Sequence, residues 1–501
     1  MPEYRTSSYV IYVDLPEDPS RMLLVHGYSG AYDVVSRPVA QYLRFLEARR
    51  APKPLYGAWS EAVAADGEDL PHAPSSRTLQ SLVERGYLTA LTIDEEIARF
   101  DGISDTLHRA AENRLTYVFM PTYDCNLRCA YCFQDHMRTD AAFAPLLRTM
   151  TPELIDRIFV GIRRLESERG AGPATDRPRD IGLFGGEPLL AASRPAVEHI
   201  LRSALADGPA TFWAISNATE LDAYADLLGP DGIGAVQITL DGPGREHDRR
   251  RIYADGSGSF ERIARNIELA LGRGVSVQVR MNVDRGNIDE LPALVDEMTE
   301  WGWVDDPNFL AYAYPIHAAN EKTDRTTTFT TWDLDLEIER LRAAHPHMAA
   351  LDRPDERIRR AARSIFTAQA EPGLRAEFCG AHSGMYIFDA LGDIYACWER
   401  TGDVRLRIGQ VNPDGRLRMN LPVLTDWRSR TVSTVRACQQ CRYALHCGGG
   451  CAVLAEGKRG TKHANYCDGF ANRFRAMVGE AFLRHEAGEV AEVERSTIAA
   501  I

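Results

Sequence analysis

The sequence lacks several features that would each place it in a particular class of protein. No apolar run approaches the roughly eighteen residues that a membrane span needs, and the N-terminal segment has neither the basic region nor the apolar stretch of a secretory signal. Basic residues are not in excess either, because 58 Lys and Arg stand against 71 Asp and Glu, which leaves a net charge of -13. We therefore expect a cytoplasmic protein that binds no membrane and no nucleic acid, since binding to the phosphate backbone demands many cations.

Cysteine is also scarce, because ten residues among 501 are too few for a small disulfide scaffold. The ten are nevertheless clustered, with three between positions 125 and 132 and the other seven between 379 and 467. Clustered thiols in a reducing compartment predict metal binding. With 45% hydrophobic and 26% charged residues, the whole chain has the composition of a soluble globular protein of several domains.

Residues 1–110 predict a small separate domain. Residues 9–13 and 22–26 are short apolar or β-branched runs typical of a hairpin, and residues 33–49 and 76–85 carry apolar side chains at helical spacing. The sequence RGYL that follows predicts a further hairpin. Together these patterns indicate a winged-helix-like unit. The alternative is a plain extension that packs on the rest of the chain.

Residues 111–320 predict an alternation of strands and helices. The predicted strands are LTYVFMPTYDC, IGLFGGEP, ATFWAISNA, AVQITLDG and VSVQVRMNV, and helices are predicted at residues 152–166, 260–272 and 287–302. This alternation favours an α/β fold with a parallel sheet, and five or six such units favour a partial (β/α)6 TIM-type barrel. Functional residues should then lie at the carboxyl ends of the strands.

Three further segments complete the predicted organisation. Residues 321–370 are expected to form a helical bridge rich in Arg and Ala. Residues 371–475 predict a cysteine-rich domain with short strands, including MYIFDALGDIYAC, in which Leu-Gly-Asp predicts a hairpin turn. Residues 476–501 are expected to form a C-terminal helix and tail.

The first cysteine cluster has the spacing C-x3-C-x2-C and follows a predicted strand: Cys125, Cys129 and Cys132. Three thiolates on a cluster of four irons leave one iron open to a small molecule. Zinc, the alternative, prefers four protein ligands, usually from two paired motifs. The spacing resembles that of the radical SAM superfamily, in which S-adenosylmethionine (SAM) binds the open iron and an electron cleaves it to a 5'-deoxyadenosyl radical.

Other barrel residues are similar to those of the same superfamily. Gly185, Gly186, Glu187 and Pro188 resemble its GGEP segment, which implies that the glycines admit SAM and that Glu187 accepts from its ammonium group. The resemblance implies contacts to the SAM carboxylate and ribose, with strand-end capping as the alternative, for Ser216, Asn217, Arg280 and Asn282. Asp241 is a candidate catalytic residue at a strand end, although Asp-Gly is also an ordinary turn.

The other seven cysteines have the spacing C-x12-G-x4-C and then C-x2-C-x5-C-x3-C-x15-C. This pattern resembles the SPASM domain of peptide-modifying radical SAM enzymes. The resemblance implies an outer cluster on Cys438, Cys441, Cys447 and Cys467 and an inner cluster on Cys379, Cys397 and Cys451. With the barrel cluster these make three [4Fe-4S] clusters and use every cysteine. A zinc ribbon would explain only the run C-x2-C-x5-C-x3-C.

The inner cluster lacks a fourth thiolate. Its last ligand is expected to be His382, three residues after Cys379, or another non-thiol group, water or the substrate. A simple loop histidine is the alternative for His382.

The resemblance implies an oxidoreductase that abstracts hydrogen from a ribosomally made precursor peptide and forms a C-C, C-O or thioether crosslink. The segments SYVIYV and LVERGYL resemble the winged-helix unit that binds the leader of such a peptide in many of these enzymes, where the leader adds as a strand to a sheet edge. A flavodoxin- or ferredoxin-type protein is the expected electron donor.

Two other functions stay open at this point. An anaerobic sulfatase-maturing enzyme makes formylglycine on the same scaffold and carries an Asp base directly after the second SPASM cysteine. Here Trp398 and Glu399 follow Cys397, so Glu399 is the candidate catalytic carboxylate. A redox-inactive scaffold that retains clusters for stability is the third possibility, which the complete cysteine set and GGEP segment disfavour.

Overall fold

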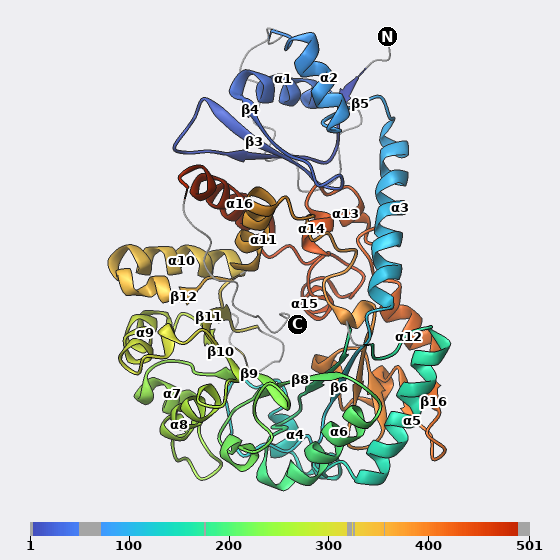
Figure 1. The fold of residues 1–501 in the computed structure, drawn as a ribbon, viewed down its shortest axis with the longest axis vertical. Helices are drawn as coiled ribbons and strands as arrows, with labels where there is room; N and C mark the ends of the chain where they lie inside the picture. Colours follow the sequence, from blue (N-terminus) through green and yellow to red (C-terminus); the bar gives the residue numbers. More distant parts are fainter. Residues whose placement is uncertain are drawn as a thin grey trace. The chain divides into compact units, whose positions relative to one another are not determined.

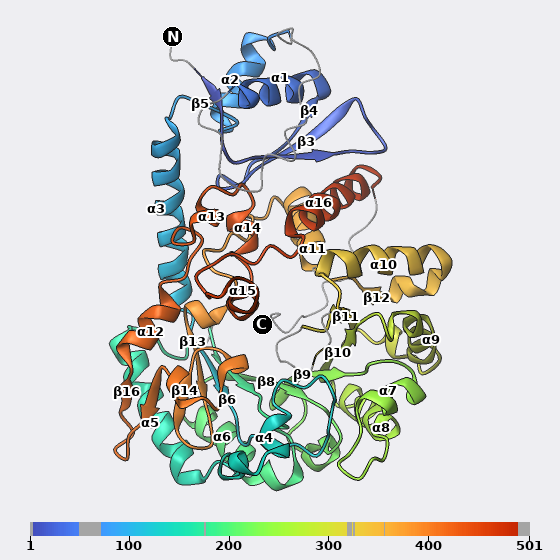
Figure 2. The same ribbon diagram turned by 180° about the vertical axis from the view of Figure 1, so that it is seen from behind.

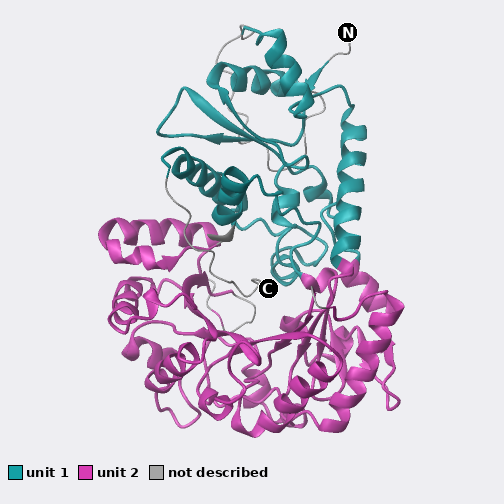
Figure 3. Ribbon diagram, viewed as in Figure 1, with its two compact units in different colours: residues 1–111, 355–379, 429–492 teal, residues 112–354, 380–428, 493–501 magenta. Residues whose placement is uncertain are grey.

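The computed structural model describes residues 4–49, 72–174, 177–317, 323, 326–354 and 356–488 (Figure 1). Its contacts divide the chain into two compact units, which Figure 3 colours separately. Unit 1 comprises Met1–Ala111, Asp355–Cys379 and Ser429–Glu492, and unit 2 comprises Glu112–Pro354, Gly380–Arg428 and Val493–Ile501. No helix within the described ranges is long and apolar enough to cross a membrane.

Unit 2 is built on an eleven-stranded sheet in the order β12-β11-β10-β9-β8-β7-β6-β13-β14-β15-β16. The barrel strands are β6 (Thr116–Phe119), β7 (Arg179–Leu183), β8 (Ala210–Ser216), β9 (Ile233–Thr239), β10 (Ser276–Val283) and β11 (Phe309–Pro315), followed by β12 (Leu351–Asp352). Each of these strands pairs in parallel with the next along the chain. The expected partial (β/α)6 barrel is therefore confirmed.

The helices of unit 2 are α4 (His136–Thr139), α5 (Pro152–Glu168), α6 (Arg194–Ala206), α7 (Gly244–Arg250), α8 (Phe260–Leu271), α9 (Leu291–Glu300), α10 (Thr331–Ala344) and α12 (Leu421–Arg428). Helix α5 shows why such a segment is helical. Thr151 caps its first turn by accepting from the Leu154 backbone N–H, and Pro152 follows at the first position, where its missing donor is harmless. Its buried side chains recur every three or four residues and form one apolar face.

The first hairpin of the cysteine-rich region continues the barrel sheet (Figure 2). Strand β13 (Met385–Phe388) pairs in parallel with β6, and β14 (Asp393–Tyr395), β15 (Gly409–Val411) and β16 (Leu417–Met419) follow in antiparallel order. The predicted turn between β13 and β14 is present, with Gly392 at φ +84. The contacts thus assign residues 380–428 to unit 2, whereas a single domain over residues 371–475 stays a prediction.

Unit 1 begins with an antiparallel sheet of three strands, β2 (Val10–Asp14), β3 (Arg21–His26) and β4 (Tyr32–Ser36). Strand β1 (Arg5–Thr6) pairs with β5 (Leu88–Thr89), and the helices of this part are α1 (Arg37–Ala48), α2 (Ser76–Glu84) and α3 (Ile93–Glu112). The predicted helix at residues 33–49 is wrong at its start, because residues 33–36 belong to β4. Ser36 is extended and Pro38 lies in the first turn of α1, so the helix begins only at Arg37.

The N-terminal sheet buries both of its faces within unit 1. Alternate residues of β2 and β3 point to opposite faces. One set packs against α1 and α2, and includes Val10, Tyr12, Met22 and Leu24. The other packs against α11 (Glu356–Ala368) and α16 (Phe470–Glu486), and includes Ile11, Val13, Leu23 and Val25. Residues far apart in the sequence therefore share one apolar core. The short helices α13 (Arg436–Gln439), α14 (Ala444–Cys447) and α15 (Ala452–Arg459) complete the described part of unit 1.

Candidate active site

A cavity lies within unit 2 at the carboxyl ends of the barrel strands. Among the predicted residues, its lining contains Cys125, Cys129, Cys132, Gly185, Gly186, Glu187, Ser216, Asn217, Arg280, Asn282 and Glu399. Pro188 and Asp241 are not part of the lining. The structure therefore brings the cysteine motif, the GGEP segment and one of the two candidate catalytic carboxylates to one site.

The three cysteines of the motif line one wall of the cavity, and their thiols lie near enough to act on one another's charge. Burial raises the pKa of Cys125 to about 12 and that of Cys129 to about 11, so both hold their protons unless a metal displaces them. Arg138 Nη2 donates to Cys132 Sγ at 3.3 Å, and Asn217 Nδ2 donates to Cys125 Sγ at 3.6 Å, which would stabilise thiolates. Three thiols at one cavity wall are a donor set that fits an iron-sulfur cluster with one open iron, whereas mononuclear zinc prefers four protein ligands.

The packing of the GGEP segment requires glycine at position 186. A Cβ on Gly186 would lie 2.2 Å from the carbonyl oxygens of both Tyr123 and Asp124. The Gly186 N–H donates to the Thr122 carbonyl at 3.1 Å, and the Glu187 N–H donates to the Asp124 carbonyl at 2.7 Å. Only glycine allows this close approach, so the GGEP segment is locked to the strand end that carries Cys125.

Glu187 is the centre of a buried hydrogen-bond network. It is 1% exposed and accepts from Ser216 Oγ at 2.7 Å, the Asn217 N–H at 2.5 Å and the Leu189 N–H at 2.9 Å. Burial raises its pKa to about 7, and these hydrogen bonds oppose the rise. Ser216 and Asn217 thus cap Glu187, and their contacts to SAM stay predictions.

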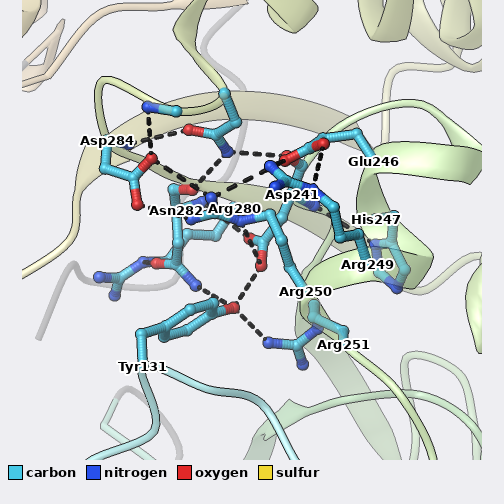
Figure 4. Close-up of polar contacts among 12 residues, drawn as sticks. Tyr131, Asp241, Glu246, His247, Arg249, Arg250, Arg251, Arg280, Asn282 and Asp284 are labelled. Atoms are coloured by element: carbon cyan, nitrogen blue, oxygen red, sulfur yellow. Dashed lines mark hydrogen bonds and ion pairs between the residues drawn. The ribbon is translucent and has the colours of Figure 1, made fainter. Parts of the chain in front are cut away.

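Asp241 is outside the cavity lining, and Figure 4 shows its polar contacts. It is 0% exposed and accepts from the Tyr131 hydroxyl and from the Asn282 backbone N–H, the latter at 3.2 Å. Tyr131 itself accepts from Arg251 Nη1 at 2.7 Å. The strand-end position predicted for Asp241 is correct, but its carboxylate is committed to neighbouring side chains. Its catalytic role stays a prediction.

Arg280 and Asn282 project from β10 into the cavity. Arg280 Nε donates to Asn282 Oδ1 at 2.9 Å, and its guanidinium lies 4.5 Å from the centre of the Tyr314 ring. Burial, assisted by Arg280, lowers the pKa of His317 to about 4, so this histidine lines the cavity as a neutral ring. The contacts of Arg280 and Asn282 to SAM stay predictions.

Glu399 is the candidate carboxylate that faces the cavity. Its Oε2 is buried without a hydrogen-bond partner among the described residues, and burial raises its pKa. The neighbouring Trp398 packs against Phe184, with ring centres 5.2 Å apart, and both rings line the same cavity. Glu399 is therefore an acceptor beside the Trp398 and Phe184 rings, available to a bound substrate, and Arg400 and Arg280 partly oppose the rise in its pKa.

Two arginines that the motifs do not reveal also line the cavity. Arg138 and Arg251 each have a buried Nε without a hydrogen-bond partner in the described part of the chain. Such donors fit the carboxylate of SAM, which would satisfy them. Neither arginine belongs to a motif in the sequence. Arg251 ends the run Arg249–Arg251, and such a run is more typical of a solvated helix face.

Six of the remaining cysteines belong to unit 1. Burial raises the pKa of Cys438, and the neighbouring thiols Cys447, Cys441 and Cys467 raise it further. The four residues predicted for the outer cluster are thus close neighbours. Of the predicted inner set, Cys379 and Cys451 lie in unit 1 and Cys397 lies in unit 2. Both auxiliary clusters stay predictions.

His382, a predicted ligand of the inner cluster, is fully buried in unit 2. Its Nδ1 lies 2.8 Å from the Trp427 carbonyl oxygen, and its ring stacks on the Trp427 ring. A carbonyl partner of this kind orients a metal-bound histidine, but it equally satisfies a core histidine. Ligation by His382 stays a prediction.

Comparison with known proteins supports the barrel assignment. Residues 119–298 match the Radical SAM superfamily model. An uncharacterized protein of Archaeoglobus fulgidus is 24% identical over 433 residues, which cover 80% of this chain and 91% of the relative. The GTP 3',8-cyclase of Erythrobacter litoralis is 26% identical over 318 residues, which cover 61% and 86% of the two chains.

Solved structures of anSMEcpe share the fold. The structure with bound AdoMet aligns with a TM-score of 0.55 at 16% identity and covers 75% of this chain and 100% of anSMEcpe. The structure with bound AdoMet and the Cp18Cys peptide aligns with a TM-score of 0.54 at 16% identity and covers 75% and 99%. Residues 119–298 are therefore a radical SAM domain, and the chain shares the α/β fold of anSMEcpe.

Proposed function

We propose that this chain is a peptide maturase that abstracts a hydrogen atom from a ribosomally made precursor peptide and forms a C-C, C-O or thioether crosslink. The observation that carries the proposal is the cavity in which the cysteine motif, the GGEP segment and Glu399 meet. The spacing of the other seven cysteines and a fold neighbour that was solved with a bound peptide add support.

The side chains of the cavity have distinct proposed roles. The three barrel cysteines would hold a [4Fe-4S] cluster, and the chemistry that this group would supply with SAM is the 5'-deoxyadenosyl radical. Arg138 and Arg251 bind the SAM carboxylate through their unpaired Nε atoms, and Glu187 accepts from its ammonium group. The rings of Phe184 and Trp398 exclude water from the radical. Glu399 accepts the proton that the substrate loses when its radical is oxidised.

The proposed leader site is the outer edge of β4. In the described part of the sheet, β4 pairs only with β3, and Val34 is 37% exposed. The His26 N–H donates to the Ala31 carbonyl, and the Arg37 N–H donates to the Ser20 carbonyl. Because hydrogen-bonded pairs alternate along an antiparallel ladder, this register directs the Val34 N–H away from β3. A leader strand can pair with these outward groups.

The auxiliary clusters and the electron supply complete the proposal. The seven remaining cysteines would hold two further [4Fe-4S] clusters, which when bound would supply an electron acceptor for the oxidation of the substrate. Cys467, in the predicted outer set, is exposed and is the natural point of contact for a flavodoxin- or ferredoxin-type partner in the cytoplasm.

The test is anaerobic incubation of the reconstituted enzyme with SAM, a reductant and a synthetic peptide for each short reading frame beside its gene. We expect a product that has lost two hydrogen atoms and whose fragment spectrum joins two residues. The Cys125→Ala/Cys129→Ala/Cys132→Ala variant is the control and should form no 5'-deoxyadenosine. An aldehyde that reacts with a hydrazide reagent would instead establish the alternative, formylglycine formation.

A further inference from the structure

Tyr131 lies within the cysteine motif, between the second and third cysteines, and its side chain reaches the ends of two barrel strands (Figure 4). Its hydroxyl donates to Asp241 Oδ2 and accepts from Arg251 Nη1 at 2.7 Å and Asn282 Nδ2 at 3.2 Å. One hydroxyl therefore connects the cysteine loop to the segment after β9, to β10 and to the residue that follows α7.

Asp241 has the contacts of an anchor. Its Oδ1 accepts from the Asn282 N–H at 3.2 Å, and its Oδ2, which accepts from Tyr131, also lies 3.9 Å from Arg250 Nε. Its backbone carbonyl accepts from Asn287 Nδ2 at 2.8 Å. A general base must reach the proton that it removes. Asp241 is fully buried outside the cavity lining and has no such access.

Arg251 supplies the opposite charge. It is 7% exposed, and it faces Cys129, Tyr131 and Asp241. A buried cation and a buried carboxylate each lose hydration, and the loss is offset only when good hydrogen bonds connect them. The Tyr131 hydroxyl makes that connection, so its removal weakens the hold of both charged groups on the loop.

We propose that Tyr131, Asp241 and Arg251 form a clamp that fixes the second half of the cysteine loop, and that Asp241 is a positioning residue for the barrel cluster. The clamp rests on the radical SAM assignment within the proposed function and not on the identity of the peptide. The loop carries the cluster that SAM must meet, and a misplacement of about 1 Å costs about a hundredfold in rate.

The test compares Tyr131→Phe, Asp241→Asn and the double variant in the reconstituted enzyme. The measurements are iron content, the dissociation constant for SAM and the change that SAM causes in the EPR spectrum of the reduced barrel cluster. We expect each single variant to bind SAM about tenfold more weakly and to lose most of the EPR change. The double variant should bind SAM about as tightly as the single variant with the lower SAM affinity. Both substitutions remove the same hydrogen bond between Tyr131 and Asp241, so their effects should not add.

Tyr117→Phe is the matched control, because it removes a buried hydroxyl that donates to Glu166 from the same barrel. Loss of iron from Tyr131→Phe but not from Tyr117→Phe would also support the clamp. If Asp241→Asn keeps its SAM affinity and EPR change but stops peptide modification, Asp241 is a base and the clamp is wrong. The clamp would also be wrong if both single variants kept the SAM affinity and the EPR change of the wild type. Iron content, SAM affinity and the EPR change are all measured without peptide, so they test the clamp even if the proposed peptide substrate is wrong.

Discussion

Arg430 carries a full positive charge inside unit 1, where it is 1% exposed. Its Nη2 donates to the carbonyls of Gly449 at 3.1 Å and Ala464 at 2.9 Å, and its Nε donates to the Lys462 carbonyl. The thiols that act on its charge come from both predicted auxiliary sets: Cys438, Cys379, Cys451 and Cys447. An anionic cluster on either set would therefore be stabilised by this arginine.

We expect Arg430→Gln to lower the reduction potentials of the auxiliary clusters, because a nearby positive charge favours the reduced and more negative state. Arg430→Lys keeps the charge and should retain the wild-type potentials. Redox titration followed by EPR measures both, with the barrel cluster as an internal reference. Unchanged potentials in Arg430→Gln with full iron content would contradict the expectation.

At the scale of single residues, the sequence reveals candidate ligands better than it reveals the side chains that surround them. The cysteines and Gly185–Pro188 can be predicted because their chemistry is encoded in spacing along the chain. Arg138 and Arg251 cannot, because only the fold turns them inward. For Asp241 the strand end is predictable, but its burial depends on the reach of Tyr131, which sequence spacing does not reveal.

Among the elements, the turn between β13 and β14 couples the cysteine-rich hairpin to the barrel. Asp389 accepts from the Leu391 and Asp393 N–H groups at 2.9 Å each and from the Tyr123 hydroxyl at 2.9 Å. Burial, and then Asp393, raise the pKa of Asp389 from 3.8 to about 6. Because the folded state keeps a proton that the unfolded state releases, stability is lost as pH rises from 3.8 to about 6, by at most about 3 kcal/mol.

Asp389→Asn cannot ionise, so the wild type should lose stability relative to this variant across that pH range. Thermal unfolding of the anaerobic protein measures the difference at each pH. Asp414→Asn, which removes a carboxylate at an exposed turn in the same unit, is the control variant. A constant difference between the wild type and Asp389→Asn would show that Asp389 does not titrate in this way.

The edge of β4 allows a test of leader binding that leaves the sheet intact. Val34→Pro removes an outward N–H without removing a hydrogen bond to β3. We expect it to weaken binding of the precursor peptide, measured by fluorescence anisotropy with a labelled leader. Val34→Ala keeps the N–H and is the matched control. Without peptide, both variants should cleave SAM at the same rate. If Val34→Pro and Val34→Ala bind the leader equally well, the leader does not bind at the edge of β4.

The elements also show where prediction from sequence ends. β7 to β10 could be predicted because β-rich runs alternate with helices of clear apolar period. β4 could not, because Val34 and Val35 fit the same helical spacing that continues into α1, and only Pro38 marks the boundary. The predicted strands do not include β11, whose sequence FLAYAYP contains no β-branched residue although its aromatic residues favour a strand.

For the whole molecule, the shared core of unit 1 predicts the effect of removing the N-terminal sheet. A truncation that lacks residues 1–105 exposes Phe474, Val478 and Phe482 of α16, each worth about 1.5–3 kcal/mol when buried. It also leaves Arg442, which pairs with Glu47 inside unit 1, without its partner. The part of unit 1 that carries most of the auxiliary cysteines should therefore become unstable.

The reconstituted full-length enzyme is expected to hold about twelve irons, four for each cluster. The truncated enzyme should fall toward about four while it keeps the EPR signal of the barrel cluster. Iron analysis and EPR together measure this outcome. Full iron content after truncation would show that the N-terminal sheet is dispensable for the cysteine-rich part.

Unit 1 is built from three segments that are far apart in the sequence. This arrangement affects the order in which the protein can fold during synthesis. β3 ends at His26, and the helix that covers one face of its sheet begins at Phe470. A ribosome that adds about 5–20 residues per second needs roughly 20–90 s to pass between them. During that interval the apolar face formed by Ile11, Val13, Leu23 and Val25 lacks α16, whereas the barrel strands, all encoded before residue 353, are already available to pair. The nascent chain should therefore depend on a chaperone early, and the barrel can receive its cluster before the auxiliary cysteines have emerged.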